Sequence, residues 1–274
     1  MAKLPKEYKF LDLSDYGRTA GNWIASQLKN TATTPIHVTS LFIVSGLVAI
    51  WCMLNGYYKT AAFFIILKSI LDAADGELSR LKNTPSYTGR YYDSIADFVL
   101  NFCFLLAFWH ITESSIVYML VAFFAIQLQG TVYNYYYVIL RNTVKGDSTS
   151  RIFEDIAPKA LKGESQQTVD MFYKVYDILY ITFDKIMYYM DKNASDSPPF
   201  PKWFMTLVSM YGLGFQLLFM AAMLALKLEA YVIPFFISYS ALILVFVGIR
   251  KLVLNLYKLG AILAITAIVS SKSS

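Results

Sequence analysis

Apolar residues occupy long stretches of this chain, and polar residues are confined to the segments between them. Six stretches are long enough, or nearly long enough, to cross a bilayer as a helix. They lie at 35–54, 57–71, 95–111, 116–140, 203–226 and 231–249. The second and third reach spanning length only if both extend into the acidic segment between them, with its carboxylates facing a bundle interior. The pattern therefore predicts an all-α, polytopic membrane protein with six transmembrane helices.

Two further segments have helical periodicity without the length or hydropathy of a span. In residues 11–30 the apolar side chains recur every three or four positions and include Trp23, which is typical of an amphipathic surface helix at the lipid headgroups. A second amphipathic helix is predicted over 169–190, ending before the Pro-rich residues 196–201. We expect it to lie on the membrane or on its own bundle rather than on a partner.

The predicted helices divide the chain into three parts. Residues 1–33 form an N-terminal interfacial segment, and residues 34–258 form the membrane domain, in which 142–202 is a cytoplasmic helical insertion. The apolar tail, 259–274, is too short to span and is predicted to be interfacial or packed.

Composition and charge agree with this class. The chain is 57% hydrophobic and only 16% charged, whereas soluble domains carry about 25% charged residues. Lys3, Lys6 and Lys9 predict a cytoplasmic N-terminus, and six spans return the C-terminus to the same side. The net charge of +5 is explained by this bias and by anionic lipid, so no nucleic-acid partner is expected. No cleavable signal peptide is predicted.

Four aspartates lie at the inner ends of the second and third stretches. Asp72 and Asp75 are three residues apart, and Asp93 and Asp97 are four apart, so each pair shares one helix face. Antiparallel helices joined by a short loop can bring the two faces together. Taken singly, each aspartate is more typical of a solvated helix end paired with a nearby cation, and Lys68 is placed to neutralise Asp72. Together they favour a shared cation site.

The ligand chemistry of such a site favours hard divalent ions. Carboxylate oxygens without cysteine or histidine suit Mg²⁺ or Mn²⁺ better than zinc, and two such ions could clamp a diphosphate. Gly76 permits close backbone approach, and Arg80, one turn on, is suited to a phosphate. Gly89 leaves room for a bulky ligand where the third helix begins.

Residues 72–97 carry the pattern Asp-x2-Asp-Gly-x2-Ser-Arg-x8-Gly-x3-Asp-x3-Asp. It resembles the signature of the CDP-alcohol phosphotransferases, also called CDP-alcohol phosphatidyltransferases, with Ser79 in place of the usual alanine. The resemblance extends more weakly over 34–141. It implies an integral membrane transferase of phospholipid biosynthesis with its active site at the cytoplasmic face. There the hydroxyl of an acceptor attacks the lipid-bearing phosphorus of a CDP-linked lipid such as CDP-diacylglycerol, and CMP leaves.

The resemblance also implies roles for individual residues. Two metal ions would be held by Asp72, Asp75, Asp93 and Asp97, and Asp97 would also be the general base. The CDP-alcohol would be bound by Gly76, Arg80, Ser86 and Gly89, and by the start of the first span at Ile36, His37, Val38 and Thr39. Many members have Asn or Asp where this chain has Ile36. Arg141 and Lys145 lie where some relatives bind a phosphorylated acceptor, although a positive-inside anchor explains them equally well.

The acceptor and the assembly are left open by the sequence. Serine, inositol phosphate, glycerol phosphate and amino alcohols all remain candidates. Residues 80–86 and 93–97 resemble phosphatidylserine synthases, but residues 98–108 lack the glycine and proline that those enzymes often carry. Family analogy suggests a homodimer.

A non-catalytic divalent-cation carrier or channel is the alternative function, because carboxylates within a membrane also bind ions in transit. That alternative predicts polar residues spread across the bilayer. The spans offer few, among them Asn101, Gln127, Gln129 and Gln216, and no acidic residue near the midplane. The sequence therefore favours the transferase.

Overall fold

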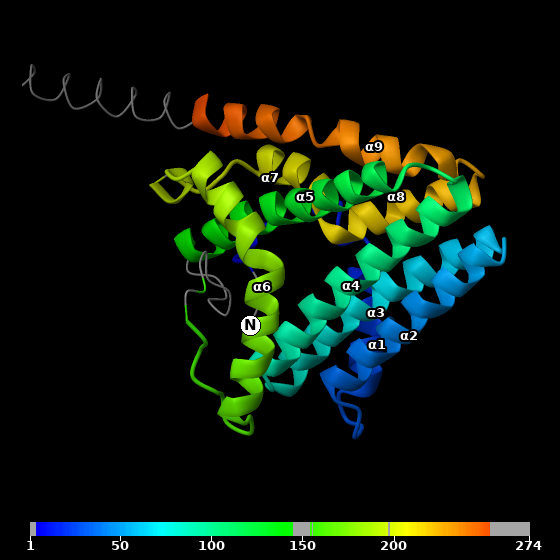
Figure 1. Cartoon of the computed structure of the whole chain (residues 1–274). Coiled ribbons are helices and arrows are strands. Elements are labelled where there is room, and N and C mark those ends of the chain that lie inside the picture. The colour runs from blue at the N-terminus through cyan, green and yellow to red at the C-terminus, as the bar shows by residue number, and fades with distance from the viewer. Residues whose placement is uncertain (1–3, 145–153, 155, 197, 253–274) are drawn as a thin grey trace, which may run out of the picture.

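The computed structural model describes residues 4–144, 154, 156–196 and 198–252, and this part of the chain is helical, without strands (Figure 1). The α-helices are α1 (Arg18–Leu28), α2 (Pro35–Leu54), α3 (Tyr58–Lys82), α4 (Tyr87–Thr112), α5 (Ile116–Thr143), α6 (Gln166–Met190), α7 (Lys202–Val208), α8 (Leu213–Ala225) and α9 (Val232–Tyr239). Short 3-10 helices are η1 (Lys6–Tyr8), η2 (Ala194–Asp196), η3 (Ser209–Tyr211) and η4 (Glu229–Tyr231). Beyond α9 the chain is helical again over 242–252.

Helices α2, α3 and α4 run side by side, and α5, α8 and α9 lie together along their upper ends in Figure 1. One hydrophobic core joins both groups, and Phe42, Ile65, Phe104 and Met220 are among its fully buried members. Buried amides connect the upper helices, since Gln216 Nε2 donates to Ile126 O at 3.0 Å. The all-α prediction is confirmed for the described residues.

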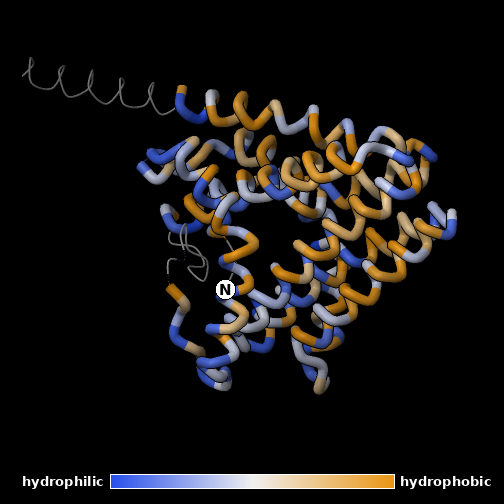
Figure 2. The backbone as a smooth tube through the Cα atoms, viewed as in Figure 1, coloured by the Kyte–Doolittle hydropathy of each residue, from blue (hydrophilic) through white to orange (hydrophobic). Residues whose placement is uncertain are grey.

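Several of these helices fit an integral membrane protein. By length and composition four can cross a membrane: Pro35–Leu54, Tyr87–Thr112, Ile116–Thr143 and Glu229–Leu252. Lys202–Tyr211 and Leu213–Ala225 make a fifth if this pair, bent by 53°, is one span. Figure 2 shows hydrophobic residues along the length of these helices.

The expected span at 57–71 lies within α3, which is not among the candidates. Its apolar part is interrupted by the charged residues Lys59, Lys68, Asp72 and Asp75. The six-span topology therefore stays a prediction, and the position of α3 in the membrane depends on how its charges are satisfied by neighbouring helices.

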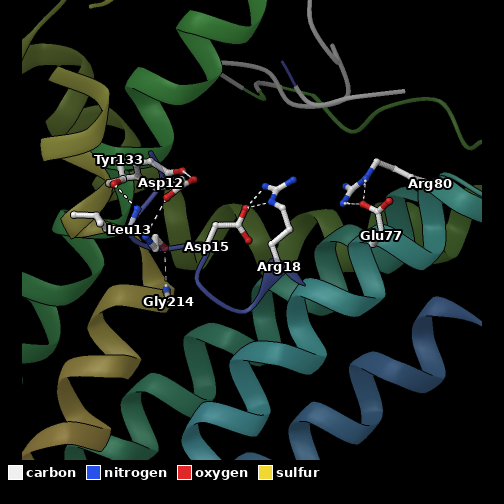
Figure 3. A network of polar contacts seen from close by, with 10 residues as sticks. Asp12, Leu13, Asp15, Arg18, Glu77, Arg80, Tyr133 and Gly214 are labelled. Atoms are coloured by element: carbon white, nitrogen blue, oxygen red, sulfur yellow. Dashed lines mark hydrogen bonds and ion pairs between the residues drawn. The ribbon is translucent and has the colours of Figure 1, made fainter. Parts of the chain in front are cut away.

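The bend between η3 and α8 is occupied by the N-terminal segment. Leu13 N donates to Ser209 Oγ at 2.9 Å, and Gly214 N donates to Ser14 Oγ at 3.1 Å (Figure 3). A Cβ atom on Gly214 would lie 1.8 Å from Ser14 O, so only glycine fits this position. The helix predicted over 11–30 consequently begins only at Arg18, because the residues before it form turns against the bundle.

Helix α1 packs on α3 through its small residues. A Cβ on Gly21 would lie 3.0 Å from Ala73 Cβ and from Ala74 N, and Ala25 is fully buried. Trp23, which the sequence analysis assigned to the apolar face, is 67% exposed. The packed face of α1 is therefore that of Gly21 and Ala25, and the membrane-surface role predicted for this helix stays a prediction.

The insertion folds as the predicted helix, α6, and crosses in front of α4 and α5 in Figure 1. Its C-terminal end is fixed by a buried ionic group. Asp191 contacts Arg250, Tyr136 Oη donates to Asp191 Oδ2 at 2.8 Å, and Tyr135 Oη donates to Asp191 O at 2.9 Å. In the structure α6 lies on its own bundle, which is one of the two placements expected for it.

Removing one partner of this buried ion pair should cost more than removing both. We expect Arg250→Met to destabilise the protein by about 3–5 kcal/mol, because Asp191 is left charged and unpaired. The double variant Asp191→Asn/Arg250→Met should recover much of the loss. Thermal unfolding in detergent micelles measures both, and equal midpoints for Arg250→Met and wild type would contradict the role of the pair.

The N-terminus of α4 is capped by a residue that is distant in the sequence. Ser86 Oγ accepts from Gly89 N at 2.8 Å and donates to Glu164 Oε1 at 2.8 Å. Thr88 N also donates to Glu164 Oε1, at 2.8 Å. Burial acts to raise the pKa of Glu164, but the hydrogen bonds from Thr88 and Ser86 outweigh it and lower this pKa. The carboxylate also complements the positive end of the helix dipole.

Glu164→Gln should lower the unfolding midpoint at pH 7, and this effect should depend on pH. A carboxyl group whose pKa is lowered by folding stabilises the protein above its unfolded pKa of about 4.3, and the stabilisation is lost as the pH falls through the folded value. The difference between variant and wild type should therefore shrink below about pH 4. Glu7→Gln, at an exposed position, is the matched control. A difference that is constant with pH would contradict the assignment.

Candidate functional site

Helices α3 and α4 bring the aspartates together as the spacing predicted. One carboxylate oxygen each from Asp72, Asp75 and Asp93 lies within 4.8 Å of the others. Asp97, one turn further along α4, contacts Lys68 Nζ through Oδ1. Three oxygen donors at this separation could hold a divalent metal ion, and their chemistry suits a hard cation such as Mg²⁺ or Mn²⁺.

Lys68 is a buried cation between the two acidic helices. Its side chain is fully buried on α3, its ammonium contacts Asp97 of α4, and Nζ lies 3.6 Å from Asp72 Oδ2. The ammonium is also 4.6 Å from the ring centroid of Phe42. The sequence predicted only its pairing with Asp72. In the structure Lys68 has the shorter contact to Asp97, so it also connects α3 to α4.

Asp75 is held by a hydroxyl group of α2. Thr39 Oγ1 donates to Asp75 Oδ2 at 2.6 Å, and both residues are buried. This hydrogen bond fixes the orientation of one of the three convergent carboxylates. Thr39 was predicted to bind the CDP-alcohol, and in the structure its hydroxyl group contacts Asp75.

A cavity of about 440 Å³ opens onto the acidic group. It is lined by half of the residues expected at the site, which are Asp72, Asp75, Gly76, Arg80, Asp93, Asp97 and Arg141. Arg141 comes from the last turn of α5, far from the acidic motif in the sequence. The fold therefore brings the motif and Arg141 into one space.

Other residues predicted to bind substrate lie away from the lining of this cavity. They are Ser86, Gly89, Ile36, His37, Val38 and Thr39. Ser86 is the N-cap of α4, and His37 Nδ1 accepts from Thr34 N at 3.1 Å in the capping box of α2. Val38 packs in a small core with Ala25 and Leu78. Contact of these residues with substrate stays a prediction, and Lys145 lies outside the described residues.

Two arginines of the cavity are paired with carboxylates (Figure 3). Arg80 Nη2 lies 2.7 Å from Glu77 Oε2, and Arg18 contacts Asp15. Arg18 belongs to the N-terminal segment, as do Asp12 and Asp15 beside it, and all three line the cavity. The cations of this segment indicated only topology in the sequence, because nothing local in the sequence indicates contact with α3 and α5.

Helix α6 supplies a third wall of the cavity, which the sequence did not predict. Tyr176, Tyr180 and Asp184 recur every fourth residue and line the cavity. Burial, followed by the nearby carboxylates of Glu154 and Asp177, raises the pKa of Asp184 to about 7. The spacing of these residues along α6 was the available signal, and it needed the packing partner of α6 to be interpreted.

Comparison with known proteins covers the part of the chain that carries the acidic motif. The family model CDP-alcohol phosphatidyltransferase matches residues 32–153. This region begins just before α2 and includes all of α3, α4 and α5, whereas α6 follows it. No curated protein matches the chain. Residues 32–153 are therefore similar in sequence to the CDP-alcohol phosphatidyltransferase family.

Proposed function

We propose that this protein is an integral membrane enzyme of phospholipid synthesis. It transfers the lipid-bearing phosphate group of a CDP-linked lipid, CDP-diacylglycerol, to the hydroxyl group of an acceptor, with release of CMP. The main support is the convergence of Asp72, Asp75 and Asp93 within 4.8 Å, in a cavity that Asp97 also lines and in the region that the family model matches.

The acidic group would hold the metal. Asp72, Asp75 and Asp93 are the ligands that geometry favours, and Asp97 completes the set if two ions bind. Bound Mg²⁺ or Mn²⁺ would neutralise the diphosphate and stabilise the charge that develops during phosphoryl transfer. The diphosphate would lie beside Gly76, where an added Cβ would have Arg80 Nη1 as its nearest neighbour, at 3.7 Å. Arg80, oriented by Glu77, would bind a phosphate oxygen.

The proton of the acceptor hydroxyl would pass to Asp97. As the hydroxyl oxygen forms its bond to phosphorus, the bond from phosphorus to the CMP oxygen breaks, and CMP leaves with that electron pair. Lys68 contacts Oδ1 of Asp97, which leaves Oδ2 to accept the proton. Lys68 thus acts as a positioning residue that holds the base on its helix face. The cations of the N-terminal segment support a cytoplasmic location for this chemistry.

The buried amides do not support the carrier alternative. Gln129 Nε2 donates to Phe236 O at 3.1 Å and to Ser240 Oγ at 2.8 Å, and Gln216 Nε2 donates to Ile126 O. These groups are used to join α5 to α8 and α9. Asn101, Gln127 and Gln216 also line the cavity. The amide nitrogens of Gln129 and Gln216 are nevertheless used in helix-joining hydrogen bonds, which favours the transferase.

Asp97→Asn should reduce CMP release without removing the cavity. With the full chain in detergent, CDP-diacylglycerol and Mg²⁺, we expect kcat to fall about 10²–10⁴-fold, the usual contribution of a general base. Chelation of the metal should abolish release by the wild-type protein. The acceptors to supply are serine, ethanolamine, inositol phosphate and glycerol phosphate.

The control for that experiment is Glu113→Gln, at the opposite end of α4. It should release CMP at the wild-type rate. Unchanged turnover in Asp97→Asn would remove Asp97 as the base. If the wild-type protein released no CMP with any acceptor and either metal, the result would contradict the transferase and favour the carrier or a family member that has lost activity.

Thr39→Val should weaken metal binding, because Asp75 loses the hydroxyl group that orients it. Removal of a hydrogen-bond partner behind a metal ligand typically costs 10–100-fold in metal affinity or activity. We therefore expect the Mg²⁺ concentration for half-maximal CMP release to rise by about 10–100-fold. Ser40→Ala is the matched control, since Ser40 Oγ donates only to Ile36 O, at 2.9 Å. Equal Mg²⁺ dependence in Thr39→Val and wild type would contradict this role.

A further inference from the structure

The face of α6 that lines the cavity is not explained by the acidic motif. Tyr176, Tyr180 and Asp184 lie one turn apart on a helix that follows the region matched by the family model. Their side chains face the same cavity as the metal-binding aspartates. Whatever this face binds must therefore lie next to the reacting groups.

A hydrogen bond fixes how close α6 comes to those groups. Tyr180 Oη donates to Ser94 O at 2.8 Å, and Ser94 directly follows Asp93 on α4. The Tyr176 and Tyr180 rings are stacked, with centroids 4.7 Å apart and planes at 23°. Both rings are thereby held against α4, and Asp184 follows on the next turn.

Asp184 is an acidic residue for which the described part of the chain provides no cationic partner. Among the described residues it makes no hydrogen bond or ion pair, although it is half-buried and lines the cavity. The charged groups that act on it are those of Glu154 and Asp177, both acidic. A partly buried carboxylate in such surroundings is unfavourable until a cation or a donor approaches it.

We propose that the acceptor alcohol carries an ammonium group and that Asp184 binds it. A carboxylate gives the ion pair, and two tyrosine rings beside it are suited to a cation through their π faces. A phosphorylated acceptor would instead place negative charge next to Asp184. This assignment rests on the proposed function and narrows its acceptor to amino alcohols and hydroxyl-bearing amino acids.

Arg141 would distinguish an amino alcohol from a hydroxyl-bearing amino acid. It lines the same cavity from α5 and offers positive charge to a carboxylate. A hydroxyl-bearing amino acid such as serine would use both Asp184 and Arg141, whereas ethanolamine would use Asp184 alone. Both acceptors carry an ammonium group, and CMP release measured with each of them shows which one the protein uses.

The test compares acceptors that differ only in the amino group. CMP release from CDP-diacylglycerol by the full chain is measured with ethanolamine against ethylene glycol, and with serine against 3-hydroxypropanoate. Glycerol phosphate and inositol phosphate complete the set. We expect the amino-bearing member of each pair to have the higher kcat/KM, by at least about tenfold, since a hydrogen bond to a charged group contributes about 1.5–3 kcal/mol.

Variants of α6 show whether Asp184 is responsible. Asp184→Asn should raise the KM of the amino acceptor by about 10–100-fold, on the same energy scale, and leave the KM of CDP-diacylglycerol unchanged. Asp184→Glu should restore part of the loss because it keeps the charge. Asp170→Asn, on the same helix but away from the cavity lining, should behave as wild type.

Each outcome decides the assignment. An unchanged acceptor KM in Asp184→Asn, or a preference for glycerol phosphate or inositol phosphate, would overturn it while CMP release still upheld the proposed function. If no acceptor supported CMP release, the proposed function itself would fail and the assignment with it. A rise in the KM of CDP-diacylglycerol in Asp184→Asn would show that α6 binds the donor and would overturn the assignment.

Discussion

Repulsion between carboxylates on α3 and α4 is the constraint on which the rest of the structure depends. Asp72, Asp75 and Asp93 hold oxygen atoms within 4.8 Å of one another, and Asp97 is one turn away. In surroundings of low dielectric constant, carboxylates this close together repel one another strongly unless positive charge lies among them. Lys68 supplies one charge and, because it contacts Asp97, also joins the two helices. One ammonium cannot balance four carboxylates, and the remaining negative charge is what makes the site suited to divalent cations.

The helices around this group hold it in position. Gly21 lets α1 approach the backbone of α3 closely, Thr39 orients Asp75 from α2, and Tyr180 joins α6 to α4 beside Asp93. Each of these contacts comes from a different helix and is made to the motif or to a residue next to it. A metal site requires ligand positions defined to a fraction of an ångström, and packing from several sides provides this better than the two acidic helices could alone.

The sequence predicted what depends on helix period and hydropathy. The spacing of Asp72, Asp75 and Asp93 fixed their helix faces, so their convergence followed once α3 and α4 were antiparallel neighbours. The start of α1 could not be predicted from the sequence, because the turns before Arg18 are held by Ser209 and Gly214, about 200 residues away. The cavity walls from the N-terminal segment and α6 were missed for the same reason. Ser86 and His37 show a further limit, since a polar residue at a helix start suits both a cap and a ligand, and their contacts in the structure are caps.

The region matched by the family model and the rest of the chain contribute different parts of the cavity. The aspartates, Gly76 and Arg80 lie within residues 32–153 and have the chemistry for a metal-bound diphosphate. Arg18 and Asp184 lie outside it, on α1 and α6, and differ in charge. Groups that bind the donor must fit one diphosphate, whereas groups that bind the acceptor must match whichever alcohol is used. Placing Asp184 on a separate helix allows the acceptor to change while the spacing of the aspartates stays fixed. On this physical argument α6, rather than the acidic motif, is where acceptor specificity is built into the chain.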